Sequence, residues 1–143
     1  MSATAEPAVT TAPARVTSSL RRRALGVAAA VLACLAIWGI GEVGGVDYTV
    51  ESPGQPAMVI GAGEIIGISL GVALLGWVSL ALLERFAPRV ARLVWISLAV
   101  LVTLLSFGPL FGVEATAGAK VALGAMHVAV AVALIAALPA RRR

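Results

Sequence analysis

Residues 57–83 read AMVIGAGEIIGISLGVALLGWVSLALL and carry one charge, on Glu64. A bilayer core is about 30 Å thick and an α-helix rises about 1.5 Å per residue, so about 20 apolar residues cross it. The second part of this stretch, residues 65–83, has that length and composition. It predicts a membrane-spanning helix against which the other helices of the chain pack.

Three glycines follow one face of this predicted helix. Gly63, Gly67 and Gly71 are spaced four residues apart, so they form a ridge of small residues. Lipid tails solvate leucine as well as a neighbouring helix does, and small residues let two helix backbones approach closely in a membrane. We therefore expect the ridge to be a packing surface. The favoured interpretation is packing inside one chain, and the alternative is the face of a homodimer.

The composition of the whole chain is that of a membrane protein. Of its 143 residues, 60% are hydrophobic and 13% are charged, whereas a typical soluble domain is about 25% charged. The net charge of +4 does not indicate nucleic-acid binding, because the basic residues flank apolar runs. The single cysteine, Cys34, excludes an intrachain disulfide. The lipid bilayer is therefore the predicted partner, and no cofactor is predicted.

Four apolar runs predict an all-α fold, an integral membrane four-helix bundle. A tail at residues 1–21, rich in Ala, Thr, Pro and Ser, is expected to be disordered. The membrane domain then covers residues 22–143. Its predicted spans are residues 24–41, 65–83, 90–107 and 118–138.

Breaker residues mark the connections between these spans. Pro88 suits the first turn of the third span, and Gly108-Pro109 is expected to end that span. The loop at residues 42–56 is rich in glycine and proline, and apolar and polar residues alternate around Tyr48. That alternation predicts a short extended segment on the membrane surface.

The first span admits a second interpretation, a secretory signal peptide. Basic residues precede its apolar core, and the four residues ending at Cys34 faintly resemble a lipoprotein cleavage box. The chain stays apolar after Cys34, where a mature lipoprotein turns polar, so a retained span is favoured. Gly26, Ala30 and Cys34 form a second stripe of small residues along this span.

Basic residues predict the orientation of the spans. With the N-terminus in the cytoplasm, ten of the eleven Lys and Arg residues fall on the inner side, and Lys120 alone falls outside. The acidic residues of the predicted outer loops lie opposite, at Glu42, Asp47, Glu51 and Glu114. This pattern predicts a multi-pass protein with cytoplasmic N- and C-termini. Heavy use of Arg and Ala suggests a bacterial plasma membrane.

His127 is the first candidate for a functional residue. It lies nine residues past Gly118, about 13 Å below the outer end of the fourth span. Ionisable groups at that depth face the protein interior and mark candidate functional sites. Thr103 and Ser106 are expected at similar depth. His127 either hydrogen-bonds a hydroxyl or carbonyl that ties two helices together, or serves a proton relay or ligand. One histidine and one cysteine do not suggest a metal site.

Glu64 and Lys120 are the next candidates. Glu64 falls at the start of the second span, where the helix dipole and free N–H groups favour a carboxylate. Lys120 falls at a similar outer depth on the fourth span. We expect the two side chains to form an ion pair. With His127 they would make a polar path from the outside to the middle of the membrane.

Four short motifs resemble those of a family of small uncharacterised four-helix membrane proteins found mainly in actinobacteria. The resemblance covers residues 22–143 and implies four spans. It singles out His127 but implies no substrate. The motifs are Gly45-Val46-Asp47, Leu82-Leu83-Glu84-Arg85, Ser106 with Gly108-Pro109, and Ala125-Met126-His127-Val128.

Two functional hypotheses follow from the sequence. The first is a non-enzymatic accessory or structural membrane protein, which needs only packing surfaces. The second is a small proton-coupled transporter or a binder of a lipophilic ligand that uses His127, Glu64, Lys120, Ser106 and Thr103. A catalytic role is not predicted. A cavity that reaches His127 would favour the second hypothesis, and a dry contact around its ring would count against transport.

Overall fold

The computed structural model describes residues 14–139 and confirms an all-α bundle of four helices, each long and apolar enough to cross a membrane. A small antiparallel hairpin connects the first two helices, with Thr49 opposite Val59 and Val50 opposite Met58. The elements are α1 (Ala14–Val43), β1 (Thr49–Val50), β2 (Met58–Val59), α2 (Ala62–Phe86), α3 (Ala91–Gly112) and α4 (Ala117–Ala137).

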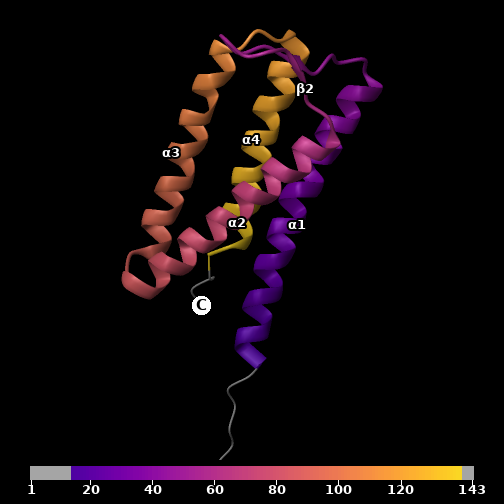
Figure 1. Ribbon diagram of the computed structural model, residues 1–143. Helices are drawn as coiled ribbons and strands as arrows, with labels where there is room; N and C mark the ends of the chain where they lie inside the picture. The colour runs from indigo at the N-terminus through magenta and orange to yellow at the C-terminus, as the bar shows by residue number, and fades with distance from the viewer. Residues whose placement is uncertain (1–13, 140–143) are drawn as a thin grey trace, which may run out of the picture.

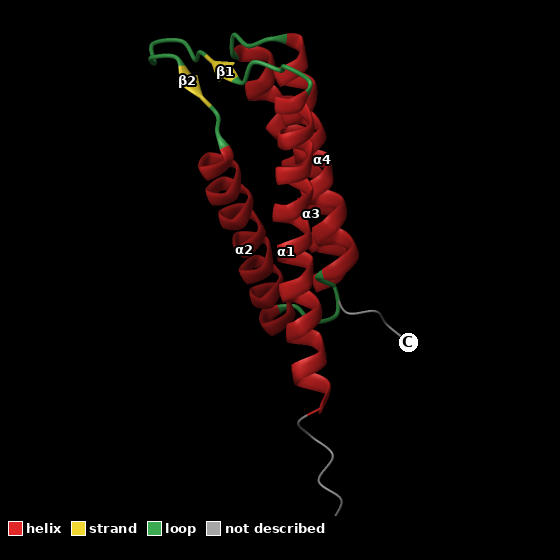
Figure 2. Ribbon diagram, turned by 90° about the vertical axis from the view of Figure 1, so that its right-hand side faces the viewer, coloured by secondary structure: helices red, strands yellow, loops and turns green. Residues whose placement is uncertain are grey.

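The helices form one layer of three with the fourth laid across it. The axes of α1, α3 and α4 run alongside one another, and α2 crosses in front of them from α1 toward α3 (Figure 1). Seen from the side, α2 leans away from the other three helices toward the hairpin end (Figure 2). The start of α1 and the end of α4 lie at the opposite end of the bundle (Figure 1).

Several predicted boundaries need correction. α1 begins at Ala14, so residues 14–21 of the predicted tail are helical, and residues 1–13 lie outside the described residues. Pro88 lies in the turn before α3 rather than inside it. α3 also continues through Pro109 to Gly112. A proline removes one N–H bond and crowds the carbonyl four residues earlier, but membrane helices tolerate it where neighbouring groups and small local adjustments satisfy the freed backbone.

The closest backbone approach joins α1 and α4. A Cβ placed on Gly26 would collide with the Cβ of Ala137, and Ala30 is completely buried. Farther along the same face, the Cys34 thiol lies 3.9 Å from the carbonyl oxygen of Met126. The small-residue stripe of α1 is therefore the surface that packs inside the chain.

The glycine ridge of α2 lies elsewhere. A Cβ added at Gly63, Gly67 or Gly71 would meet no atom within 4 Å in the described structure. The favoured interpretation, packing of this ridge inside the chain, is therefore wrong, and α2 is not the helix on which the others pack. α2 turns its ridge outward because its buried face carries Ile65, Ser69, Ala73 and Leu80.

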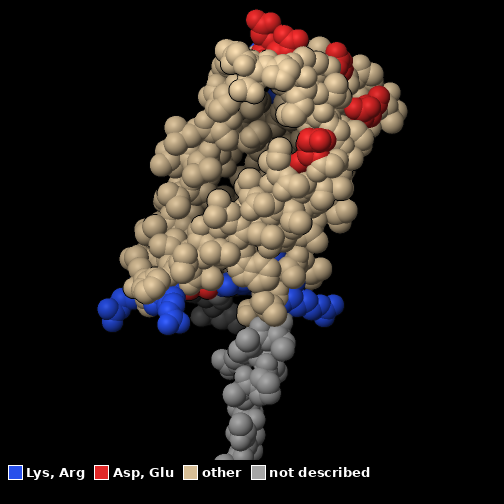
Figure 3. All heavy atoms as spheres, viewed as in Figure 1, with Lys and Arg blue, Asp and Glu red and all other residues tan. Residues whose placement is uncertain are grey.

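Charge separates strongly between the two ends of the bundle. Apart from Lys120 near the start of α4, the described Lys and Arg side chains gather around the end from which α1 starts, and most acidic side chains gather at the hairpin end (Figure 3). At the basic end, Arg23 donates to both carboxylate oxygens of Glu84 at 2.6 and 2.7 Å, and its Nε donates to the Leu138 carbonyl at 3.2 Å. One guanidinium thus fastens α1 to α2 and to the end of α4.

The hairpin end is closed by two aromatic side chains. Tyr48 is 2% exposed, and its hydroxyl donates to the Trp38 carbonyl at 3.3 Å. The indole N–H of Trp38 donates to the Ile60 carbonyl at 3.2 Å. A Cβ on Gly41 would collide with the Tyr48 hydroxyl. The predicted extended segment is present, but its tyrosine is buried beneath the hairpin rather than lying on a surface.

Burial raises the pKa of the Tyr48 phenol, and the nearby charge of Glu42 raises it further. Tyr48 is the only tyrosine in the chain, so tyrosinate absorbance reports on it alone. We predict that Tyr48 of the folded protein in detergent ionises at higher pH than the tyrosine of the denatured chain, which ionises at about pH 10. Because the folded pKa is the higher one, this group's contribution to stability is complete below about 10 and is lost as pH rises further.

A Tyr48→Phe variant is the control, since it should abolish the absorbance change and the alkaline loss of stability that belongs to this group. Coincident titration midpoints for the folded and denatured protein would contradict the prediction.

Candidate functional site

A cavity of about 570 Å³ lies between α2 on one side and α3 and α4 on the other. The surface is hollowed there, between α3 and α2, with α4 behind (Figure 3). Hairpin residues Val50 and Met58 line it at one end, and Trp95 lines it toward the other. Trp95 lies 17 residues before the end of α3 at Gly112, about 26 Å along the helix. The cavity therefore extends through most of the thickness of a bilayer core.

The lean of α2 creates this cavity. At the basic end α2 is held close, because the Trp95 indole donates to the Gly76 carbonyl at 2.9 Å and Arg23 binds Glu84. At the other end the hairpin separates the start of α2 from α3. Apolar side chains of α2, such as Ile68 and Val72, consequently face the cavity instead of a neighbouring helix.

Three of the five predicted site residues line this cavity together: His127 from α4, and Thr103 and Ser106 from α3. Ser69 of α2 and Cys34 of α1 line it as well. Thr103, Ser106 and His127, which were expected at similar depth in the membrane, therefore share one cavity. These five side chains form a polar band in a mostly apolar cavity wall, which is the usual construction of a small-molecule site.

His127 does not tie two helices together through a hydrogen bond. Its Nδ1 lies 2.7 Å from the carbonyl oxygen of Leu123, one turn earlier in the same helix. In a neutral ring this contact assigns the proton to Nδ1, so Nε2 has a free lone pair. The Phe107 ring supports the imidazole from α3, with ring centroids 6.1 Å apart and planes inclined by 42°.

The hydroxyl groups of the cavity also bond to their own helices. Thr103 donates to the Ala99 carbonyl at 2.7 Å, and Ser106 donates to the Thr103 carbonyl at 2.6 Å. Ser69 donates to the Ile65 carbonyl at 2.6 Å. Serine and threonine in helices commonly bond back to the preceding turn in this way. These three hydroxyl bonds stay within single helices, whereas the contact of the Cys34 thiol with the Met126 carbonyl joins α1 to α4.

Glu64 lies outside this cavity. α2 begins at Ala62, and the Glu64 carboxylate accepts a hydrogen bond from the Gly61 N–H at 3.0 Å. This is the carboxylate half of a capping arrangement at a helix N-terminus. Within the described residues, Glu64 does not pair with Lys120, and the ion pair joins Arg23 to Glu84.

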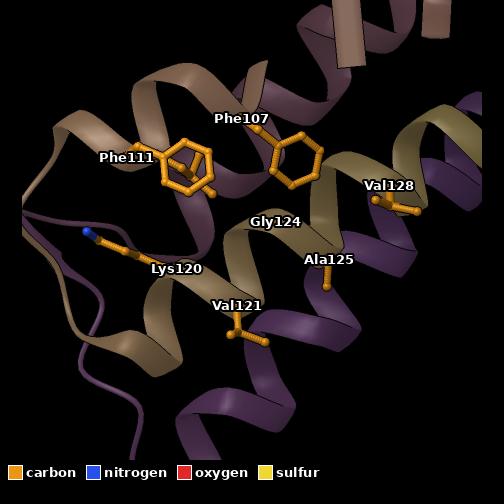
Figure 4. A pocket seen from close by; sticks show the side chains of 8 residues that line it. Phe107, Phe111, Lys120, Val121, Gly124, Ala125 and Val128 are labelled. Carbon is orange, nitrogen blue, oxygen red and sulfur yellow. The ribbon is translucent and has the colours of Figure 1, made fainter. Parts of the chain in front are cut away.

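Lys120 lines a second, shallower groove of about 360 Å³ between α3 and α4. The Phe107 ring lies next to Gly124 there, and the amino group of Lys120 points away from Val128 (Figure 4). The predicted polar path through Glu64 and Lys120 to His127 is therefore not assembled. Depth along a helix does not determine the direction in which a side chain points, so the sequence could not reveal this.

Cys34 and His127 share the cavity without bonding to each other, since the thiol contacts Met126 and the imidazole contacts Leu123. Among residues 14–139, no three His, Cys, Asp or Glu side chains group closely enough to hold a metal ion. Sequence reasoning missed Trp95 as a cavity residue. The only sequence signal was an aromatic residue four positions after the start of α3. The partner of its indole, the Gly76 carbonyl of α2, is known only from the structure.

These features define a small multi-pass membrane protein whose helices line a laterally open, apolar cavity with one polar band. The chain belongs to a family of unknown function, DUF6069, whose profile matches residues 14–143. This membership agrees with the resemblance to an uncharacterised family, whereas the actinobacterial origin remains a prediction. No curated protein and no solved structure matches the chain.

Glu64 and Lys120 should contribute to stability independently of each other. Glu64→Ala is predicted to cost about 0.3 to 1 kcal/mol through loss of the charge at the helix N-terminus, and Lys120→Ala should cost less. Unfolding of both single variants and the double variant in detergent measures their coupling. We expect additivity within about 0.3 to 0.5 kcal/mol. A larger coupling energy would show that the two charges interact after all.

Proposed function

We propose that this protein is a non-enzymatic membrane protein that holds a lipophilic molecule in the cavity between α2, α3 and α4. The observation that carries the proposal is the cavity itself, which reaches His127 and is about 570 Å³ in volume. Ligand sites of small molecules are mostly apolar cavities of about 300 to 1,000 Å³ with a few placed polar groups. A purely structural bundle would have no need of such a space.

The lateral opening supports a ligand that arrives through lipid. The hollow faces outward between α2 and α3 at the depth of the apolar helices (Figure 3). A lipophilic molecule dissolved in the bilayer could enter there without crossing water. Cavity walls such as Leu98 and Val102 would bury its apolar part, although burial against protein gains little over lipid itself, so shape and polar contacts must supply selectivity.

Binding is favoured over transport because the charged residues do not lead to the cavity. Glu64 caps α2 and Lys120 lies in the other groove, so a proton path to His127 is not supported. Binding is favoured over catalysis because the Cys34 and His127 groups each bond to backbone carbonyls. A nucleophile needs its base within hydrogen-bond reach.

The proposed location is the bacterial plasma membrane, with both termini in the cytoplasm. The charge separation between the two ends supports this orientation (Figure 3), because Lys and Arg are retained on the cytoplasmic side. The described basic residues of that end are Arg21, Arg22, Arg23, Arg85, Arg89 and Arg92.

The cavity proposal is tested by filling the space. Val102→Trp places an indole in the cavity lining, whereas Val100→Trp places one on the same helix at a residue outside that lining and of similar exposure, 46% against 55%. After purification, mass spectrometry should find a lipophilic molecule retained by the wild type and by Val100→Trp. Retention by Val102→Trp should fall at least about fivefold, since the indole occupies the site. Equal retention by all three proteins, or none above bulk lipid, would refute the proposal.

We further propose that two copies associate through Gly63, Gly67 and Gly71. The support is that this ridge faces outward with open space beside each glycine, and small residues at four-residue spacing allow close helix contact. The ridge lies on the outward side of α2, so the dimer would leave the cavity accessible.

A leucine on the ridge should weaken the dimer. Gly67→Leu blocks close backbone approach, whereas Gly39→Leu adds the same side chain to α1, also in open space. Energy transfer between labelled copies in dilute proteoliposomes should fall several-fold for the first variant and remain unchanged for the second. Wild-type transfer no greater than random proximity would exclude the dimer.

A further inference from the structure

We infer that the molecule bound in this cavity presents a hydrogen-bond donor, a hydroxyl or N–H group, to the middle of the membrane. The inference rests on the proposed function and specifies its ligand class as lipophilic alcohols, phenols or amides. Esters, ketones and ethers, which carry only acceptors, would be disfavoured. The side-chain hydrogens of the polar band are already bonded to carbonyl oxygens of the protein.

Each polar group of the band has used its own hydrogen. Thr103, Ser106 and Ser69 donate to carbonyls of their own helices, as described above. The Cys34 thiol contacts the Met126 carbonyl, and Nδ1 of His127 bonds the Leu123 carbonyl. Each hydroxyl has a single hydrogen, so only lone pairs remain to face a ligand.

The indole donors near the cavity are committed too. The Trp95 N–H bonds the Gly76 carbonyl at 2.9 Å, and the Trp38 N–H bonds the Ile60 carbonyl at 3.2 Å. The polar band described here is therefore an acceptor surface, with three hydroxyl oxygens and the imidazole Nε2. A neutral imidazole nitrogen and hydroxyl oxygens are all competent acceptors.

These acceptors lie in one band of depth. Measured along its own helix from the hairpin end, Ser106 is six residues deep and Thr103 nine. Ser69 is seven residues deep and His127 ten. At about 1.5 Å per residue, the four groups fall between about 9 and 15 Å below the outer helix ends. A ligand donor at that depth can thus meet an acceptor from α2, α3 or α4.

The surrounding lipid makes the pairing of a ligand donor with these acceptors important for affinity. Lipid hydrocarbon at that depth supplies no water to satisfy a polar group. A ligand acceptor placed against an acceptor wall leaves both groups unpaired, whereas a donor satisfies itself and one lone pair. Loss of such a buried bond commonly changes affinity by about tenfold or more. The donor group therefore distinguishes the ligand from lipids that have a similar apolar part but no donor.

The test compares each alcohol with its own methyl ether, which keeps the shape and removes the donor. Oleyl alcohol and geranylgeraniol serve as probes, beside their ethers. Binding to the full-length protein in nanodiscs is followed by tryptophan fluorescence, to which Trp95 in the cavity wall contributes. Affinities are corrected for partition into empty nanodiscs. We expect at least one alcohol to bind about tenfold more tightly than its ether.

Variants then assign the selectivity to the band. His127→Phe keeps an aromatic ring beside Phe107 but removes Nε2, and the alcohol-to-ether ratio should fall toward one. If that variant does not fold, Thr103→Val combined with Ser106→Ala takes its place, with the same expectation. Ser79→Ala is the matched control, because Ser79 lines the same cavity 17 residues along α2, far from the band, and should keep the full ratio.

The outcomes separate the two proposals. Equal binding of each alcohol and its ether to the wild type would overturn the donor inference and leave the lipophilic site standing. Binding of no probe, together with no retained molecule after purification, would overturn both. A full ratio that persists in His127→Phe and in the hydroxyl variant would overturn the assignment to this band.

Discussion

The structure depends on one constraint, that a polar hydrogen inside lipid must find its acceptor within the protein. Backbone groups meet this constraint by forming helices, which is why only helical segments cross the membrane here. Side chains meet it by bonding back to the preceding turn, as Ser69, Thr103 and Ser106 do. In the polar band, the same bonds leave hydroxyl lone pairs facing the cavity between the helices.

A second consequence concerns how the helices pack. The hydroxyl and imidazole bonds of the polar band lie within single helices. The association of the helices therefore depends largely on close contact between small residues. α1 and α4 achieve that contact at Gly26 and Ala137. At the basic end α2 is held by the Arg23–Glu84 pair and by the Trp95 bond to Gly76. At the other end Ile65 is buried in the core cluster that contains Tyr48, and the cavity on which the functional proposals rest lies between α2 and α3.

Sequence reasoning succeeded for properties that each segment carries by itself. The four spans, the polar caps such as Glu64 and the depth of His127 follow from length, hydropathy and residue position. It failed where the rotation of one helix about another decides the outcome. Gly63, Gly67 and Gly71 were expected inside the chain but face outward. Lys120 has the depth to meet Glu64 but turns into a different groove.

The sequence alone therefore determined four membrane-crossing helices and the segregation of basic from acidic residues, because length, apolarity and charge position act locally on insertion into lipid. Only the tertiary structure decided which small-residue stripe is buried, that α2 leans away, and that His127 shares a cavity with Thr103 and Ser106. Those features depend on the mutual rotation and tilt of whole helices. Rotating a helix about its own axis by a few tens of degrees moves a side chain from the cavity to the lipid, while the sequence pattern of that helix stays the same.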